Sequence, residues 1–274
     1  MTYFLIILIF ISAFCLYGLW TNRQLELEAI TLPISDLPEE LANLKILHVS
    51  DIHLRRLRVP LTTLLKTSQD TTPDLILITG DTIDRTESLD SSKILTVIND
   101  FAQIAPTFVI EGNHETSSGQ LETWRQLIIS SQAQLLENQF TTIEINEQMI
   151  GLIGLRNEET DLPAEVKAKT TEQSLNLLLA HHPELFNEYA ASFKDYPIQA
   201  VFSGHAHGGQ IRLPGIDGLL SPHQGWFPKL TNGVYLHQKK ENFTLVVSRG
   251  LSNSKFPFRI NNKPHLLLVT LVKS

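Results

Sequence analysis

The chain has 274 residues, of which 42% are hydrophobic and 19% charged, and its formal net charge is −7 at pH 7. This composition is typical of a globular protein and excludes wholesale disorder, while the net negative charge gives no reason to expect a nucleic-acid partner. The single Cys15 cannot form a disulfide within the chain.

Residues 3–20 are an uncharged run dominated by Ile, Leu and Phe and closed by Tyr17 and Trp20. This length just reaches that of a membrane-spanning helix, so we predict that residues 1–21 are a single-pass anchor in the cell membrane. A cleaved signal peptide is the competing interpretation, although no Lys or Arg precedes the run and no small-residue cleavage site follows it. A buried core helix is a weaker alternative. Arg23 is the only nearby basic residue, so the sequence leaves open which side of the membrane the rest of the chain faces.

The next segment, 22–44, is polar and acidic and contains Pro33 and Pro38. We predict that it is a linker with an edge strand near 25–32, and that residues 45–274 form one α/β domain. Because the domain begins so soon after the apolar run, its functional site would lie close to the membrane surface.

Five short apolar runs in the domain are typical of strands that are buried on both faces. They are 45–50, 74–79, 107–111, 175–180 and 198–203. Helix-like stretches near 60–70 and 88–104 separate the first three, which predicts parallel strands in two βαβ units. A pair of strands is predicted in 140–155, and two further strands in 243–248 and 265–271. This mixed pattern favours two sheets over one simple doubly wound sheet.

A polar motif follows each of the five runs. The motifs are Asp51-Ile-His53, Gly80-Asp81-Thr-Ile-Asp84-Arg85, Gly112-Asn113-His114-Glu115, His181-His182-Pro183 and Gly204-His205-Ala-His207. Because parallel strands end at the same edge of a sheet, we expect the first three motifs to converge. Their carboxylates, amide oxygen and imidazoles suit a pair of divalent ions such as Mn, Fe or Zn, and the absence of thiolates argues against a closed structural zinc site.

Two such ions can activate a water and neutralise the charge of a phosphoryl group. Asp81 is the best candidate to bridge them. His114 would protonate the leaving oxygen while Asp84 holds its ring, and Arg85 would bind a phosphate oxygen. The predicted metal ligands are Asp51, His53, Asp81, Asn113, His181, His205 and His207. Of the other histidines, His48 is expected in the core, and His223, His237 and His265 are expected to be structural or exposed.

The five motifs together, in this order, resemble the calcineurin-like metallophosphoesterase superfamily. The resemblance implies a four-layer α/β/β/α sandwich of two mixed sheets with a dinuclear metal site, and its ligand positions agree with the seven predicted above. His181 and His182 compete for one of these positions, and His181 is preferred because it directly ends the strand, where the family has its ligand. The stretches 203–214 and 247–250 are similar to a membrane-associated bacterial branch that includes phosphodiesterases and UDP-2,3-diacylglucosamine diphosphatases.

Four residues are candidates for substrate contacts: Arg55, Arg56, His182 and Gln210. Arg55, Arg56 and Arg58 form either a solvated basic loop or a contact for an anionic lipid or nucleotide diphosphate.

The sequence thus predicts a membrane-anchored hydrolase that cleaves a phosphodiester or pyrophosphate bond by metal-activated water, in a lipid-linked or nucleotide substrate. Two alternatives stay open. One is a protein or small-molecule phosphomonoesterase, and the other is a membrane-tethered binding module that has kept the metal site but lost turnover.

Overall fold

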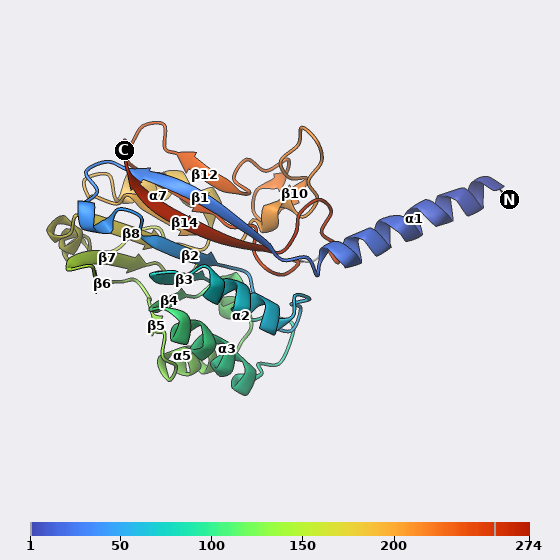
Figure 1. Ribbon diagram of the computed structural model, residues 1–274, viewed down its shortest axis with the longest axis horizontal. Helices are drawn as coiled ribbons and strands as arrows, with labels where there is room; N and C mark the ends of the chain where they lie inside the picture. The colour runs from blue at the N-terminus through green and yellow to red at the C-terminus, as the bar shows by residue number, and fades with distance from the viewer. Residues whose placement is uncertain (1, 255) are drawn as a thin grey trace.

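Two six-stranded mixed sheets pack face to face in the computed structural model of this chain, which describes residues 2–254 and 256–274 (Figure 1). Strands β2 to β5 of the first sheet are parallel, whereas β14 runs antiparallel to β2 and parallel to the edge strand β1. The order of this sheet is β1 (Glu26–Ile34), β14 (His265–Lys273), β2 (Lys45–Val49), β3 (Leu75–Thr79), β4 (Thr107–Ile110) and β5 (Gln134–Leu135).

The second sheet has four parallel central strands and an antiparallel strand at each edge. One of these edges belongs to the predicted strand pair of 140–155, which is present as the hairpin β6–β7. The order is β12 (Gly233–Leu236), β13 (Thr244–Val247), β9 (Ala200–Ser203), β8 (Leu175–Leu179), β7 (Gln148–Gly154) and β6 (Gln139–Ile145).

Helices cover the outer face of each sheet. A core that includes Ile76, Val97 and Trp124 joins the first sheet to α2 (Leu61–Asp70), α3 (Ser91–Ile104) and α5 (Leu121–Ile129). A second core with Leu178 and Tyr189 joins the other sheet to α7 (Phe186–Ser192), close to the short α6 (Ala164–Ala168). The third core lies between the sheets. Strands such as β3 and β8 are buried throughout because both of their faces are covered, and the predicted mixed α/β fold of two sheets between helical layers is confirmed.

Short elements complete the chain. They are η1 (Glu39–Leu41), α4 (Asn113–Ser117), η2 (Lys169–Glu172), η3 (Pro183–Leu185), η4 (His207–Gly209) and the hairpin β10 (Leu220–Ser221)–β11 (Gly225–Trp226).

The amino-terminal helix α1 (Thr2–Thr21) projects away from the sheets (Figure 1). Its mean hydropathy over an 18-residue window is 2.3, and only 11% of that window is buried, so it is long and apolar enough to span a membrane. At its base, the Tyr17 hydroxyl donates to Asn261 Oδ1 at 2.7 Å, and Gly18 packs tightly against Phe258.

The helix ends at the edge of the first sheet where the polar motifs lie. Strand β1 pairs along its whole length with β14, within the segment expected as a linker. Because β1 is parallel to β14 and β14 is antiparallel to β2, the start of β1 lies beside the carboxyl ends of β2, β3 and β4. The apolar helix and the strand-end motifs therefore share one edge of the molecule.

Candidate metal centre

The loops after five parallel strands bring the predicted ligands together. Asp51 follows β2, Asp81 follows β3, and Asn113 begins α4 directly after β4. From the second sheet, His181 follows β8 and His205 follows β9, so the centre lies where the edges of the two sheets meet.

The first group of ligand atoms comes from Asp51, His53, Asp81 and His207, all of which are buried. His53 Nε2 lies 3.7 Å from Asp81 Oδ2, and His207 Nε2 lies 3.4 Å from Asp51 Oδ1. Metal–ligand bonds of about 2.0–2.2 Å in a tetrahedral arrangement place neighbouring ligand atoms about 3.3–3.6 Å apart, so these spacings fit one cation.

The second group contains Asp81, His181 and His205. His181 Nε2 lies 3.4 Å from Asp81 Oδ2, 3.2 Å from Asn113 Oδ1 and 3.3 Å from His205 Nδ1. Asp81 belongs to both groups, which is the arrangement expected for a carboxylate between two ions. His181, rather than His182, is the residue that lies beside Asp81.

Three of the histidines are held in the same way. The Nδ1 atoms of His53, His181 and His207 lie 3.0, 2.7 and 2.9 Å from the carbonyls of Ile83, Thr79 and Ser252. Each Nδ1–H donates to its carbonyl, so Nε2 faces the centre and can offer its lone pair to a cation there. His53 Nε2 is buried and has no hydrogen-bond partner in the described part of the chain, as expected of a nitrogen that binds a cation.

The backbone at the centre is strained. Five of the seven predicted ligands have positive φ angles, a conformation that side chains with a Cβ rarely adopt. They are Asp51, His53, Asp81, His205 and His207. Glycine is required beside them at position 80, where φ is +88° and a Cβ would lie 2.7 Å from His181 Nδ1.

Glu115 supports the loop of Asp81, a role that the sequence did not reveal. Its buried carboxylate accepts hydrogen bonds from the backbone N–H groups of Asp81, Thr82, Ile83 and Gly112. Trp124 Nε1–H donates to the Thr82 hydroxyl at 2.8 Å. The four buried N–H groups are satisfied by one side chain, which fixes the turn that presents Asp81.

The protonation states suit cation binding. Burial lowers the pKa of His53 to about 4 and that of His207 to about 3, so both rings are neutral at pH 7 and can bind a metal without releasing a proton. Burial opposes the charged forms of Asp81 and His181, but their mutual attraction lowers the pKa of the carboxyl and raises that of the imidazole. A divalent ion bound between them would take the place of a proton on His181.

His114 lies at the rim of the first group. Its ring is 4.3 Å from the His53 ring between centroids, and its Nδ1 accepts a hydrogen bond from the backbone N–H of Arg85 at 3.1 Å. That bond makes Nε2 the protonated nitrogen of the neutral ring. Asp84 Oδ2 is 3.5 Å from His114 Nδ1, which is an electrostatic contact rather than a hydrogen bond.

The candidate substrate residues have different environments. Arg56 is engaged with the protein itself, since its guanidinium contacts Asp84 at 2.7 and 3.2 Å. Arg55 is half exposed and pairs with Glu87 at 3.2 Å. Gln210 is buried, and neither polar atom of its side chain has a hydrogen-bond partner among the described residues.

The remaining histidines also differ from one another. His48 is a core residue that bonds Thr79 Oγ1 at 2.8 Å, and His265 is buried and contacts Glu28 Oε2 at 3.0 Å. His237 packs against Phe186. His223 is exposed, as expected, and its Nδ1 lies 2.7 Å from Nε2 of His205.

The residues present fit a pair of divalent ions. Two groups of buried donors share a carboxylate, the spacings between donor atoms suit metal bonds, and the Nε2 atoms of three imidazoles face the centre. The donor set combines carboxylate, amide oxygen and imidazole.

Comparison with known proteins agrees with this centre. The family model "Calcineurin-like phosphoesterase" matches residues 44–209. The phosphodiesterase YaeI of Escherichia coli is 28% identical over 84% of this chain and 83% of its own length. The UDP-2,3-diacylglucosamine pyrophosphatase LpxG of Chlamydia muridarum is 27% identical over 89% of this chain and 90% of its own. A transmembrane protein with a metallophosphoesterase domain from Danio rerio is 27% identical over 96% of this chain and 61% of its own length.

Proposed function

This chain belongs to the calcineurin-like phosphoesterase family, and on that premise we propose that it is a membrane-anchored hydrolase of phosphodiester or pyrophosphate bonds. Family membership and the phosphodiesterase and pyrophosphatase relatives support a metal-dependent phosphoester hydrolase. The type of bond, the class of substrate and the membrane anchor are our proposals.

The observation that carries the proposal is the pair of ligand groups that share Asp81. We assign Asp51, His53, Asp81 and His207 to one ion. Asp81, Asn113, His181 and His205 would hold the other. When bound, two divalent ions neutralise the charge of the phosphoryl group and acidify a nearby water.

His114 is the residue we assign to protonation of the leaving oxygen. In the neutral ring Nδ1 accepts from the Arg85 N–H and Nε2 carries the proton. The acid is the imidazolium, in which Nδ1 is protonated as well and faces Asp84 Oδ2 at 3.5 Å, so that Nε2 can give its proton to the leaving oxygen. Burial lowers the pKa of His114 from its ordinary value of 6.5, which makes the protonated ring a stronger acid. Asp84, whose carboxylate is held by Arg56 and Thr86, keeps a negative charge close to the ring and favours its protonation.

Membrane anchoring rests on α1 and its surroundings. The helix exposes apolar side chains along its length, which in water would be an unusually large uncovered surface. The β10–β11 hairpin lies towards the same end of the molecule as α1 (Figure 1). It exposes Trp226, and Phe227 directly after it is also exposed, the kind of residues that lie at the surface of a bilayer.

This placement supports a lipid-linked substrate. Since α1 ends at the edge that carries the metal centre, the centre would face the membrane surface, where a lipid phosphoester presents its head group. The name of LpxG, a UDP-2,3-diacylglucosamine pyrophosphatase, supports a pyrophosphate in a nucleotide-linked lipid as one form of that substrate.

The test is hydrolysis by detergent-purified full-length protein, with Mn²⁺ and with chelator. Bis-p-nitrophenyl phosphate, p-nitrophenyl phosphate and a lipid-linked pyrophosphate such as UDP-2,3-diacylglucosamine are the substrates, with Asn113→Ala as the impaired variant. We expect Mn²⁺-dependent turnover of the diester or the lipid pyrophosphate that exceeds turnover of the monoester.

Other outcomes would replace the proposal. Faster cleavage of the monoester would favour a phosphomonoesterase, and no metal-dependent turnover of any substrate would favour a binding module.

A further inference from the structure

A second cluster of potential ligands lies on the outer side of His205, away from the paired groups. We call the side chains of His182, Glu184 and His223 the outer cluster. His182 Nδ1 is 2.8 Å from Glu184 Oε1, and His223 Nδ1 is 3.5 Å from the same oxygen. The Nε2 atom of His205 lies 2.7 Å from His223 Nδ1 and 3.7 Å from Glu184 Oε1.

We propose that the outer cluster is a third cation site, which takes a zinc-type divalent ion in addition to the pair at the dinuclear centre. Together with Nε2 of His205, the outer cluster brings three imidazole nitrogens and one carboxylate oxygen within 4.8 Å of one another. Imidazole-rich sets of this kind suit borderline ions such as Zn²⁺, whereas the first group, with two carboxylates, is more tolerant of Mn²⁺.

The hydrogen-bonding pattern calls for a positive charge in the cluster. His182 Nε2 lies 2.7 Å from Asn157 Oδ1 and His182 Nδ1 lies 2.8 Å from Glu184 Oε1, so both ring nitrogens face acceptor oxygens. An imidazole with one N–H can donate to only one of them, so the other contact calls for a cation or a second proton. A proton can join only one such pair, whereas a metal ion can serve all four donor atoms.

Burial supports the same assignment. The side chain of His182 is 2% exposed and that of Glu184 is 16% exposed. Glu184 Oε2 is buried and has no hydrogen-bond partner in the described part of the chain. A buried carboxylate oxygen without a partner is costly unless a cation neutralises it.

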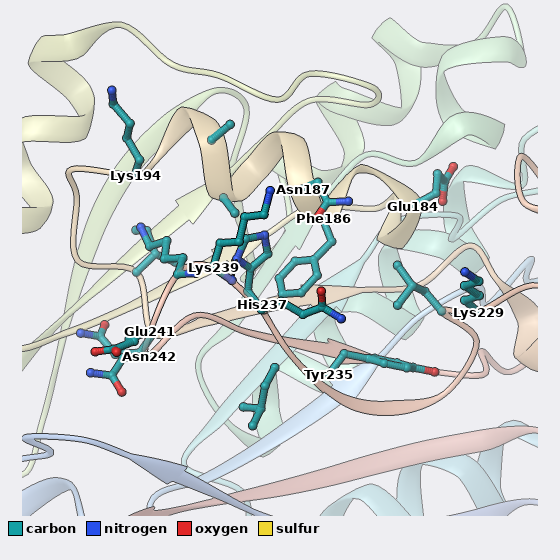
Figure 2. A pocket seen from close by; sticks show the side chains of 18 of the residues that line it. Glu184, Phe186, Asn187, Lys194, Lys229, Tyr235, His237, Lys239, Glu241 and Asn242 are labelled. Atoms are coloured by element: carbon teal, nitrogen blue, oxygen red, sulfur yellow. Dashed lines mark hydrogen bonds between the residues drawn. The ribbon is translucent and has the colours of Figure 1, made fainter.

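The outer cluster is open to solvent on one side. The His223 side chain is 54% exposed, which leaves room for a water or a substrate oxygen in a remaining coordination position. Glu184 and His223 also line a groove of about 1850 Å³ between α7 and residues 223–242. Glu184 lies towards one end of this groove, and Lys239 and Glu241 lie towards the other (Figure 2).

The shared histidine sets the order of binding. His205 directs Nδ1 towards His181 and Nε2 towards the outer cluster. Two cations held by one imidazole repel each other, so the third ion should bind after the pair and more weakly.

The experiment is a metal count on full-length protein in detergent. Protein loaded with Mn²⁺ is dialysed against a slight excess of Zn²⁺, and bound Mn plus Zn is measured by elemental analysis. We expect three ions per chain in the wild type, and two in His223→Ala and in Glu184→Gln. The matched control His237→Ala, which replaces a histidine outside the cluster, should keep three.

Two ions per chain in the wild type would overturn the proposal, and so would a third ion that survives either substitution. His223 is half exposed and Gln has the shape of Glu, so both variants should fold, which circular dichroism will verify. Turnover is not needed as a readout, so this test is independent of the proposed function.

Discussion

Replacing Gly80 by alanine tests how tightly the backbone holds the metal centre. Gly80 has φ +88°, and a Cβ there would lie 2.7 Å from His181 Nδ1 and 2.8 Å from the Gly112 backbone. The positive φ alone costs about 1–2 kcal/mol for alanine, and forcing a methyl group into a packed site adds about 1–3 kcal/mol. We therefore expect Gly80→Ala to lose about 2–5 kcal/mol in the free energy of unfolding.

The matched control is Gly119→Ala. Gly119 also has a positive φ, +70°, but a Cβ there would meet no atom within 4 Å. This variant should lose only the conformational part, about 1–2 kcal/mol, and should keep the metal affinity of the wild type.

Urea unfolding of the chelated proteins gives the stabilities, and titration with Mn²⁺ gives the affinities. Because the new methyl group would displace the ring of His181, Gly80→Ala should weaken the binding of one ion at least tenfold. Equal stability losses in the two variants, together with unchanged Mn²⁺ affinity in Gly80→Ala, would refute the reasoning.

Three further predictions concern charge and the membrane. Arg56→Ala removes the guanidinium from the buried Asp84 carboxylate and should lower the free energy of unfolding in urea by about 1–3 kcal/mol. Arg55 is half exposed, so Arg55→Ala should lower it by under about 1 kcal/mol, and similar losses in the two variants would contradict the assigned contact. Burial lowers the pKa of His48 to about 3, so below pH 6.5 the unfolded chain gains a proton that the folded chain does not. Through this group the free energy of unfolding of the metal-free protein should fall by about 2 kcal/mol between pH 7 and pH 5. His48→Gln should flatten that pH dependence by the same amount, and an unchanged slope would contradict it. Leu8→Arg places a charge within α1 and should make insertion of the helix into a membrane less favourable by about 3 kcal/mol. A smaller fraction of the variant should then stay in the membranes after a carbonate wash, and an unchanged fraction would count against the anchor.

The sequence predicted the parts of the site that depend on strand order. Asp51, Asp81 and Asn113 each follow a strand of the same parallel set, so their convergence follows from βαβ geometry alone. The apolar helix and most strands could also be located, because runs of buried residues have a clear pattern.

Other features depend on contacts between distant segments. His223 meets Glu184 across 39 residues, in a loop that no periodic pattern predicts. Arg56 was a candidate either for a substrate contact or for a solvated basic loop, and its contact with Asp84 could not be predicted because 28 residues separate the two. The role of Glu115 cannot be recognised in the sequence. Three of the backbone N–H groups that donate to its carboxylate lie 32–34 residues earlier in the chain, and the fourth belongs to Gly112.

The positive φ angles of the predicted ligands are another feature that the sequence did not predict. A Gly can be recognised in a sequence as a site for such angles, whereas Asp51, His53 and His207 adopt them because the surrounding fold holds them there. Local propensity gives no indication of this strain.

The central claim is that Asp81 joins two cations into one hydrolytic centre. Electron paramagnetic resonance of protein loaded with Mn²⁺ tests it most directly, with turnover of bis-p-nitrophenyl phosphate measured on the same samples. We predict a spin-coupled Mn²⁺ pair in the wild type, and loss of both the coupling and the turnover in Asp81→Ala. An uncoupled signal in active wild-type protein, or full turnover in the variant, would contradict the claim.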